Sequence, residues 1–137
     1  MRCTCRCLQG AHLTRSGRQR EDELGPAYRV MRANDVKVRD GEDDRRLFYF
    51  DDTVDIVVVT GTNQHVEPAH RHTQNTEIYY VIQGSLLLVV DGRQLCLNEG
   101  DLVTVYPGAC HHFETAGEQV VFMAIKKEPG LLDKELC

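Results

Sequence analysis

The chain has 137 residues, a formal net charge of −5 and a hydrophobic content of 42%. A chain of this length forms one domain and can bury a sizeable core. Residues 1–20 contain five arginines and no acidic residue, so the remainder carries 11 basic and 21 acidic residues, or −10. An acidic body excludes nucleic acid as the main partner. No apolar run approaches the length of a transmembrane helix, which excludes a membrane-spanning protein.

The first part of the chain differs in composition from the rest. Residues 1–24 are polar, rich in arginine and without apolar periodicity, so they are predicted to be a disordered tail, with a folded domain over residues 25–137. No apolar signal-peptide core is visible. The six cysteines lack the spacing of a secreted disulfide framework, which predicts a reducing, cytoplasmic location. In that compartment Cys110 is expected to be a small buried hydrophobic residue.

Turn residues recur every eight to ten residues between β-rich runs, a rhythm typical of an all-β sandwich or barrel. The predicted strands cover 47–50, 55–60, 77–82, 86–90, 94–97, 102–106, 111–115 and 120–126, with an extended segment over 65–72. Asp91-Gly92 is the strongest hairpin signal. Residues 131–136 are predicted to form one short helical turn.

Three of these runs, 56–59, 86–90 and 120–125, are apolar without alternation, as in strands that bury both faces. In a small barrel one face of each strand fills the interior. The other face must then be covered by a second sheet or a second subunit. This pattern predicts a homodimer.

A group of histidine and glutamate residues has the composition of a metal site. His70 and His72 are two residues apart, so in a strand they point to the same face. Glu77 begins the next predicted strand, and His111 follows the turn at Pro107-Gly108. Imidazole and carboxylate groups suit divalent first-row transition metals.

These residues carry a resemblance to a known family. The patterns His70-x-His72-x4-Glu77-x6-Gly84 and Gly100-x6-Pro107-Gly108-x2-His111 resemble the two motifs of the cupin family, and the likeness covers about residues 55–125. The resemblance implies a double-stranded β-helix, or jelly-roll barrel, with a metal inside. It also implies one divalent transition metal, Mn, Fe, Ni, Zn, Co or Cu, bound by His70, His72, Glu77 and His111.

The sequence departs from the family pattern at three positions. Gln64 stands where a glycine is usual, the proline of the second motif is shifted by one position to Pro107, and Thr115 replaces the usual asparagine. All three are turn or backbone positions. They bear on loop geometry and leave the implied ligands intact.

Strand parity extends the candidate site beyond the ligands. Tyr79 shares its parity with Glu77, and Phe113 shares its parity with His111, so both are expected to face the interior. Val81 and Val103 complete the predicted apolar walls of a substrate pocket. Tyr79 either packs in the core with a buried hydroxyl or contacts the substrate.

Four protein ligands on a six-coordinate metal leave two positions for water, oxygen or a bidentate ligand, and an open position marks a catalytic site. This predicts a metal-dependent enzyme that acts on a small oxygen-rich molecule, as an isomerase or a dioxygenase. The alternatives are a non-catalytic cupin that binds or senses a small molecule, and a purely structural barrel. The sequence identifies no general base, and Tyr79 is the best candidate.

Overall fold

The computed structural model describes residues 30–32, 34, 36–40, 44–50, 53–128 and 131–137. The chain divides into two compact units, Met1–Met31 and Arg32–Cys137. All strands of the described residues belong to the second unit. The predicted tail, residues 1–24, lies outside the described residues.

The described part of the chain contains strands and no helix. The strands are β1 Lys37–Asp40, β2 Asp44–Phe50, β3 Asp55–Gly61, β4 Gln64–Val66, β5 His70–His72, β6 Glu77–Gln83, β7 Ser85–Val90, β8 Arg93–Asn98, β9 Leu102–Val105, β10 His111–Ala116, β11 Val120–Lys126 and β12 Lys134–Leu136. Asp91 and Gly92 both have positive φ, 47° and 77°, as the predicted two-residue hairpin requires. In the described residues, therefore, no helix could cross a membrane.

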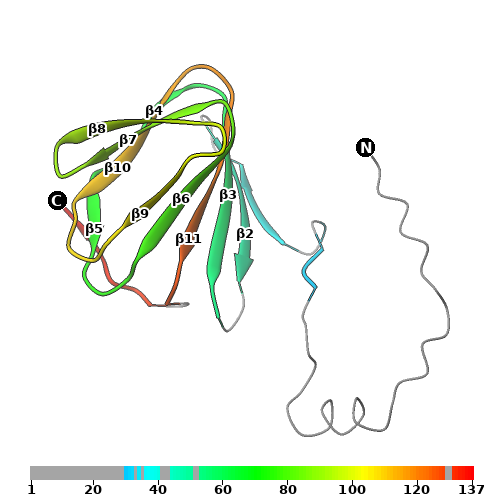
Figure 1. The fold of residues 1–137 in the computed structure, drawn as a ribbon. Helices are drawn as coiled ribbons and strands as arrows, with labels where there is room; N and C mark the ends of the chain where they lie inside the picture. Colours follow the sequence, from blue (N-terminus) through cyan, green and yellow to red (C-terminus); the bar gives the residue numbers. More distant parts are fainter. Residues whose placement is uncertain (1–29, 33, 35, 41–43, 51–52, 129–130) are drawn as a thin grey trace, which may run out of the picture. The chain divides into compact units, whose positions relative to one another are not determined.

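The strands form two antiparallel sheets (Figure 1). One has the order β1-β2-β3-β11-β6-β9, and the other has the order β12-β5-β10-β7-β8 with β4 paired to β10. Strands distant in sequence are neighbours in both sheets, as in a double-stranded β-helix. The predicted all-β jelly-roll barrel is confirmed.

The core lies between the sheets and follows the alternation of the strands. In β6 the buried positions are Glu77, Tyr79 and Val81, and β10 buries its alternate positions in the same way. The rings of Phe113 from β10 and Phe122 from β11 meet edge to face with centroids 5.0 Å apart, which joins the two sheets. At the first residue of β6 and of β10, the same parity that buries apolar residues also buries Glu77 and His111.

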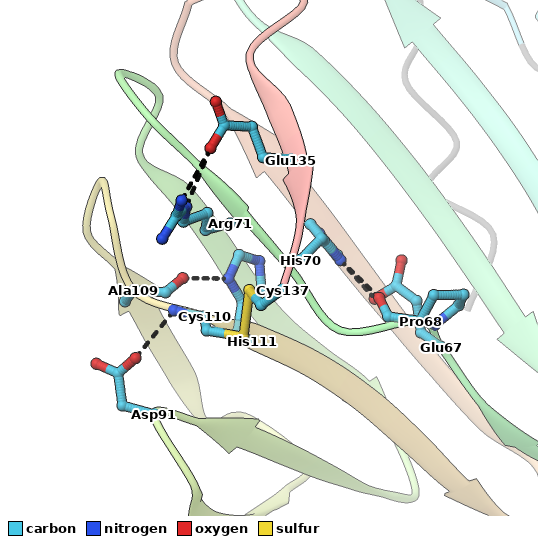
Figure 2. The surroundings of a disulfide bond; sticks show 10 residues. All are labelled: Glu67, Pro68, His70, Arg71, Asp91, Ala109, Cys110, His111, Glu135 and Cys137. Atoms are coloured by element: carbon cyan, nitrogen blue, oxygen red, sulfur yellow. Dashed lines mark hydrogen bonds and ion pairs between the residues drawn. A yellow bond between two sulfur atoms is a disulfide. The ribbon is translucent and has the colours of Figure 1, made fainter.

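The C-terminal segment corrects two of the predictions. Residues 134–136 form strand β12 and not a helical turn, because β12 pairs with the edge of β5 and so satisfies backbone groups that would otherwise be unpaired. Cys110 is half-buried and forms a disulfide with Cys137, with Cα atoms 6.3 Å apart (Figure 2), so it is not a free hydrophobic residue. β12 and β10 pair with opposite edges of the short strand β5, which brings the two cysteines together, and their separation of 27 residues gave no local signal.

Candidate metal centre

Four donor side chains from three strands converge at one end of the barrel. His70 and His72 lie on β5, His111 begins β10, and Glu77 begins β6 in the opposite sheet. All four side chains are buried, and one donor atom of each lies within 4.8 Å of the others. The structure therefore brings together all four residues that the cupin resemblance implied, and the group could hold a metal ion.

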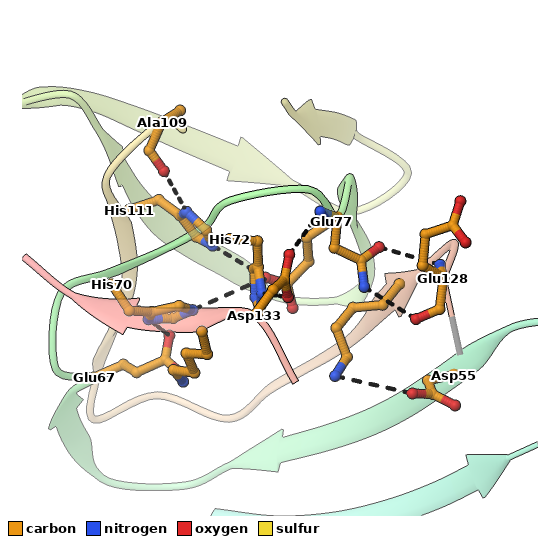
Figure 3. Close-up of polar contacts among 12 residues, drawn as sticks. Asp55, Glu67, His70, His72, Glu77, Ala109, His111, Glu128 and Asp133 are labelled. Atoms are coloured by element: carbon orange, nitrogen blue, oxygen red, sulfur yellow. Dashed lines mark hydrogen bonds and ion pairs between the residues drawn. The ribbon is translucent and has the colours of Figure 1, made fainter. Parts of the chain in front are cut away.

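Two of the three imidazoles are oriented by backbone carbonyl groups nearby in sequence. The Nδ1 atom of His70 lies 3.0 Å from the carbonyl oxygen of Pro68, and Nδ1 of His111 lies 3.0 Å from that of Ala109 (Figures 2 and 3). A carbonyl oxygen only accepts, so each Nδ1 carries the proton. In the neutral ring Nε2 then presents a lone pair to the centre of the cluster.

The third imidazole is oriented by a residue that the sequence reasoning missed. Oδ1 of Asp133 accepts a hydrogen bond from Nδ1 of His72 at 2.9 Å (Figure 3), and Oδ2 accepts from the backbone N–H groups of Gln74 at 2.9 Å and Asn75 at 2.7 Å. Burial alone would raise the pKa of Asp133, but these hydrogen bonds hold it below its usual value. A carboxylate behind a ligating imidazole fixes its tautomer and its direction.

Glu77 is the common partner of the three rings. Its Oε2 atom lies 3.0 Å from Nε2 of His111, 3.1 Å from Nε2 of His72 and 3.9 Å from Nε2 of His70. Burial would raise the pKa of Glu77, but hydrogen bonds with the three histidines lower it far below its usual value. The hydrogen bond to Glu77 likewise raises the pKa of His72, against the effect of burial.

These contacts test whether a metal fits the donor set. With neutral imidazoles, three Nε2 lone pairs and a carboxylate oxygen face one another, and such an arrangement needs a positive charge among them. A proton or a divalent cation can supply that charge. Three nitrogen donors and one oxygen donor suit a first-row transition metal. The Nδ1 atom of each histidine is already hydrogen-bonded, which leaves Nε2 for the metal.

The C-terminal segment ties the strands of the cluster together. β12 pairs with β5, and the N–H of Cys137 donates to the carbonyl oxygen of Ala69 at 3.1 Å. The disulfide then joins Cys137 to Cys110, the residue before His111 (Figure 2). The segment therefore links the two strands of this sheet that carry the candidate donors, β5 and β10.

A cavity of about 210 Å³ opens over the cluster. Its described lining residues are Arg46, Phe48, Val57, Val59, Glu67, His70, His72, Glu77, Tyr79, Phe113, Phe122, Ala124, Lys126 and Lys134. Of the four predicted wall residues, Tyr79 and Phe113 line it. Val81 lies in the closed core and Val103 packs against that core, so neither is among the described lining residues.

The tyrosine considered as a general base is fully enclosed. Tyr79 is 1% exposed. Burial raises its pKa well above the usual value, and the charges of Glu77 and Glu67 raise it further. Its hydroxyl is therefore a neutral phenol near neutral pH, which can take part in a hydrogen bond but does not supply a basic phenolate.

Comparison with known proteins identifies the family. A family model described as "Cupin domain" matches residues 57–126, about half of the chain. No curated protein matches. Among solved structures, the chain is similar to an RmlC-like cupin from Shewanella frigidimarina, with 19% identity, a TM-score of 0.66, and coverage of 78% of this chain and 96% of that one.

Two structures with named activities are also similar. Pac13, described as a unique nucleoside dehydratase, has 15% identity and a TM-score of 0.67, and the match covers 80% of this chain and 91% of that one. A Lactobacillus farciminis oxalate decarboxylase in a formate complex has 19% identity and a TM-score of 0.65 over 75% of this chain and 34% of that one. Likenesses at this level of identity establish the fold alone.

Proposed function

The chain belongs to the cupin family, and we propose that it is a metal-dependent enzyme acting on a small oxygen-rich molecule. One divalent transition metal, Mn, Fe, Ni, Zn, Co or Cu, would be held by the four converging donors. The observation that carries the proposal is the convergence of three Nε2 lone pairs and one carboxylate oxygen at a cavity.

When bound, the metal would supply Lewis-acid polarisation of a carbonyl group, for an isomerase, or oxygen activation, for a dioxygenase. The chain's own residues perform the remaining tasks. Phe113 and Phe122 exclude bulk water from one side of the cavity, and the Tyr79 hydroxyl offers a neutral hydrogen-bonding group near Glu77. The activities named for the similar structures, a dehydratase and a decarboxylase, are consistent with an enzyme and do not select the reaction.

The metal site is tested by a pair of neighbouring histidines. Replacing His111 with alanine should abolish retention of metal, measured by plasma mass spectrometry after reconstitution with each candidate metal. His112→Ala is the matched control, because His112 contacts Glu114 and is not part of the cluster. Wild-type metal content in the His111→Ala protein would sink the ligand assignment.

A second candidate function is a non-catalytic cupin that binds or senses a small molecule. It is favoured by one observation, the burial of Tyr79 as a neutral phenol, because the described residues then offer no phenolate base at the site. The two functions are separated by incubating the metal-loaded protein with its tightest ligand. Recovery of a changed product supports the enzyme, and recovery of unchanged ligand supports the binding protein.

Two further proposals concern assembly and location. A homodimer is supported by exposed apolar side chains on and beside the edge strand β9, where Leu102 is 58% exposed and Tyr106 is 71% exposed. Light scattering after size-exclusion chromatography tests it, and a monomer mass would contradict it.

The cytoplasmic location rests on cysteine spacing, and the Cys110–Cys137 disulfide counts against it. Cell fractionation with thiol trapping of the protein decides between the compartments.

A further inference from the structure

Taking the proposed function as the premise, we infer that the ligand of the cavity is a small anionic hydroxy acid. Its carboxylate is held by Arg46, and its hydroxyl donates a hydrogen bond to Glu67. Three features of the described residues lead to this ligand: the charge of the lining, the placement of Arg46, and a buried carboxylate oxygen.

The charge balance of the lining favours an anion. The cationic lining residues are Arg46, Lys126 and Lys134, and the anionic ones are Glu67 and Glu77. Two more carboxylates adjoin the lining: Asp55, 3.9 Å from Lys126, and Asp133, behind His72. These described groups carry three positive and four negative charges, and a bound divalent metal would bring their sum to +1. A monoanionic ligand would balance this charge, and buried charge is tolerated where it is paired.

Arg46 supplies the geometry that a carboxylate needs. It reaches from β2, and the carbon of its guanidinium group lies 5.8 Å from the centre of the Phe113 ring on β10, in the other sheet. Burial is the main cause of the raised pKa of Tyr79, and the charge of Arg46 opposes that rise, so the guanidinium also acts on the Tyr79 hydroxyl. A planar guanidinium fork beside an aromatic ring is suited to bidentate binding of a carboxylate.

Glu67 is the reason why the ligand should carry a hydroxyl group. Glu67 is 9% exposed, and its Oε2 atom is buried without a hydrogen-bond partner among the described residues. Two nitrogen atoms approach its carboxylate, both beyond hydrogen-bond distance. Nζ of Lys134 lies 3.6 Å from Oε1, and Nδ1 of His70 lies 3.9 Å from Oε2. The His70 proton is already donated to Pro68. An unsatisfied buried acceptor destabilises the protein, so a ligand that places a hydrogen-bond donor at Oε2 would be selected.

The size of the cavity agrees with a small acid. About 210 Å³ is the volume of roughly seven water molecules at about 30 Å³ each. The lining also contains apolar residues, among them Phe48, Val57 and Phe122, so the polar groups of the ligand must meet the polar lining residues. Arg46, Glu67 and the metal donors would each engage a different oxygen of the ligand.

The test uses the full-length Co(II)-loaded protein and two sets of matched probes. Lactate, propionate and propane-1,2-diol share a three-carbon chain, and gluconate and sorbitol share a six-carbon chain. Binding is measured by calorimetry and by the visible spectrum of Co(II). Lactate should bind more tightly than propionate and the diol, and gluconate more tightly than sorbitol, by about tenfold or more. Equal or tighter binding of the neutral compounds would overturn the inference.

Variants assign the two recognition groups. Arg46→Gln should weaken binding of the acids by about 10- to 100-fold and leave the neutral compounds unaffected, and Arg46→Lys should recover part of the loss. Glu67→Gln should weaken lactate and leave propionate unchanged. Arg93→Gln, an exposed change of the same charge on β8, is the control and should alter nothing. An Arg46→Gln protein that still prefers acids, at an unchanged melting temperature, would refute the role of Arg46.

Failure of the premise is visible in the same experiment. If the protein retains Co(II) but shows no preference for hydroxy acids, the inference is wrong and the proposed metal site stands. If no metal is retained, the proposed function is wrong. Without the metal the charges counted above sum to −1, so the inference that the site selects an anion is then overturned as well.

Discussion

Replacing Asp133 with asparagine should weaken metal binding although it removes none of the four donors. The two carboxylate oxygens of Asp133 accept three hydrogen bonds, one from the imidazole of His72 and two from the backbone N–H groups of Gln74 and Asn75. An asparagine side chain of the same shape has only one acceptor oxygen. Its NH₂ group must therefore face an N–H donor on one side.

The size of the loss in metal affinity depends on which oxygen of Asp133 the NH₂ group of asparagine replaces. Oδ2 serves two backbone donors, at 2.9 and 2.7 Å, so the amide oxygen should stay there and the NH₂ group should face Nδ1 of His72. The ring must then accept at Nδ1 and carry its proton on Nε2, the atom that points to Glu77. Loss of such a supporting partner typically lowers metal affinity by about 10- to 100-fold, or about 1.4–2.7 kcal/mol.

Competition against a chromophoric chelator measures the affinity for Co(II) or Zn(II), and the thermal unfolding midpoint monitors the fold. Glu135→Gln is the matched control, because Glu135 lies two residues after Asp133, carries the same charge and makes a half-exposed ion pair with Arg71 at 3.1 Å. That pair is worth about 0–1 kcal/mol and does not touch the cluster. Wild-type metal affinity in a folded Asp133→Asn protein would refute the argument.

Three further predictions concern stability. Replacing Cys110 with serine opens a disulfide that closes a separation of 27 residues and should lower the free energy of unfolding, measured in urea, by about 3.5 kcal/mol; an unchanged value would contradict the pairing. Gly84→Ala should destabilise more than Gly100→Ala, which should cost about 1–2 kcal/mol. Both glycines have positive φ, but a Cβ at Gly84 would lie 2.5 Å from a backbone carbonyl oxygen and one at Gly100 would meet nothing within 4 Å, so equal losses would show that the clash is relieved. In the metal-free protein, the raised pKa of His72 gives stability that is present below pH 6.5 and lost as pH rises through the folded pKa. The lowered pKa of Glu77 gives stability that is present above pH 4.5 and lost as pH falls toward its folded pKa. The unfolding midpoint should therefore peak between these values, and a flat profile from pH 4 to 8 would speak against the ion pair.

The donors could be predicted from the sequence because their signal is local. His70 and His72 share a face by strand parity, and the cupin spacing then adds Glu77 and His111, which the structure places in one cluster. Parity also placed Tyr79 on the inner face of β6, where it is buried. These inferences need only the period of a strand and the spacing between short motifs.

Parity could not show where the cavity ends. Val81 has the same parity as Tyr79 and lies on the same inner face, but it belongs to the closed core and not to the described cavity lining. The cavity instead extends toward β2, β3 and β11, where Arg46 and Lys126 line it. Those residues come from strands far from the motifs in sequence, and only the order of the sheet brings them to the site.

The second group of missed residues belongs to the C-terminal segment. All three residues of β12 are exposed, so the strand carries no alternating apolar signal. It forms because the edge of β5 offers backbone partners, with Lys134 opposite His72 and Leu136 opposite His70. Asp133 acts on His72 across a separation of 61 residues, which no local pattern reveals.

The three imidazoles therefore depend on different parts of the chain for their orientation. His70 and His111 each donate to the carbonyl oxygen two residues earlier, so the two motifs encode these orientations themselves. His72 donates instead to Asp133, in a segment held by β12 and by the disulfide. An imidazole binds metal only through a nitrogen that carries no proton. His72 is therefore the candidate donor whose tautomer is fixed by a residue outside the two motifs. The C-terminal segment thus belongs to the candidate metal centre as much as the strands that carry the four donors.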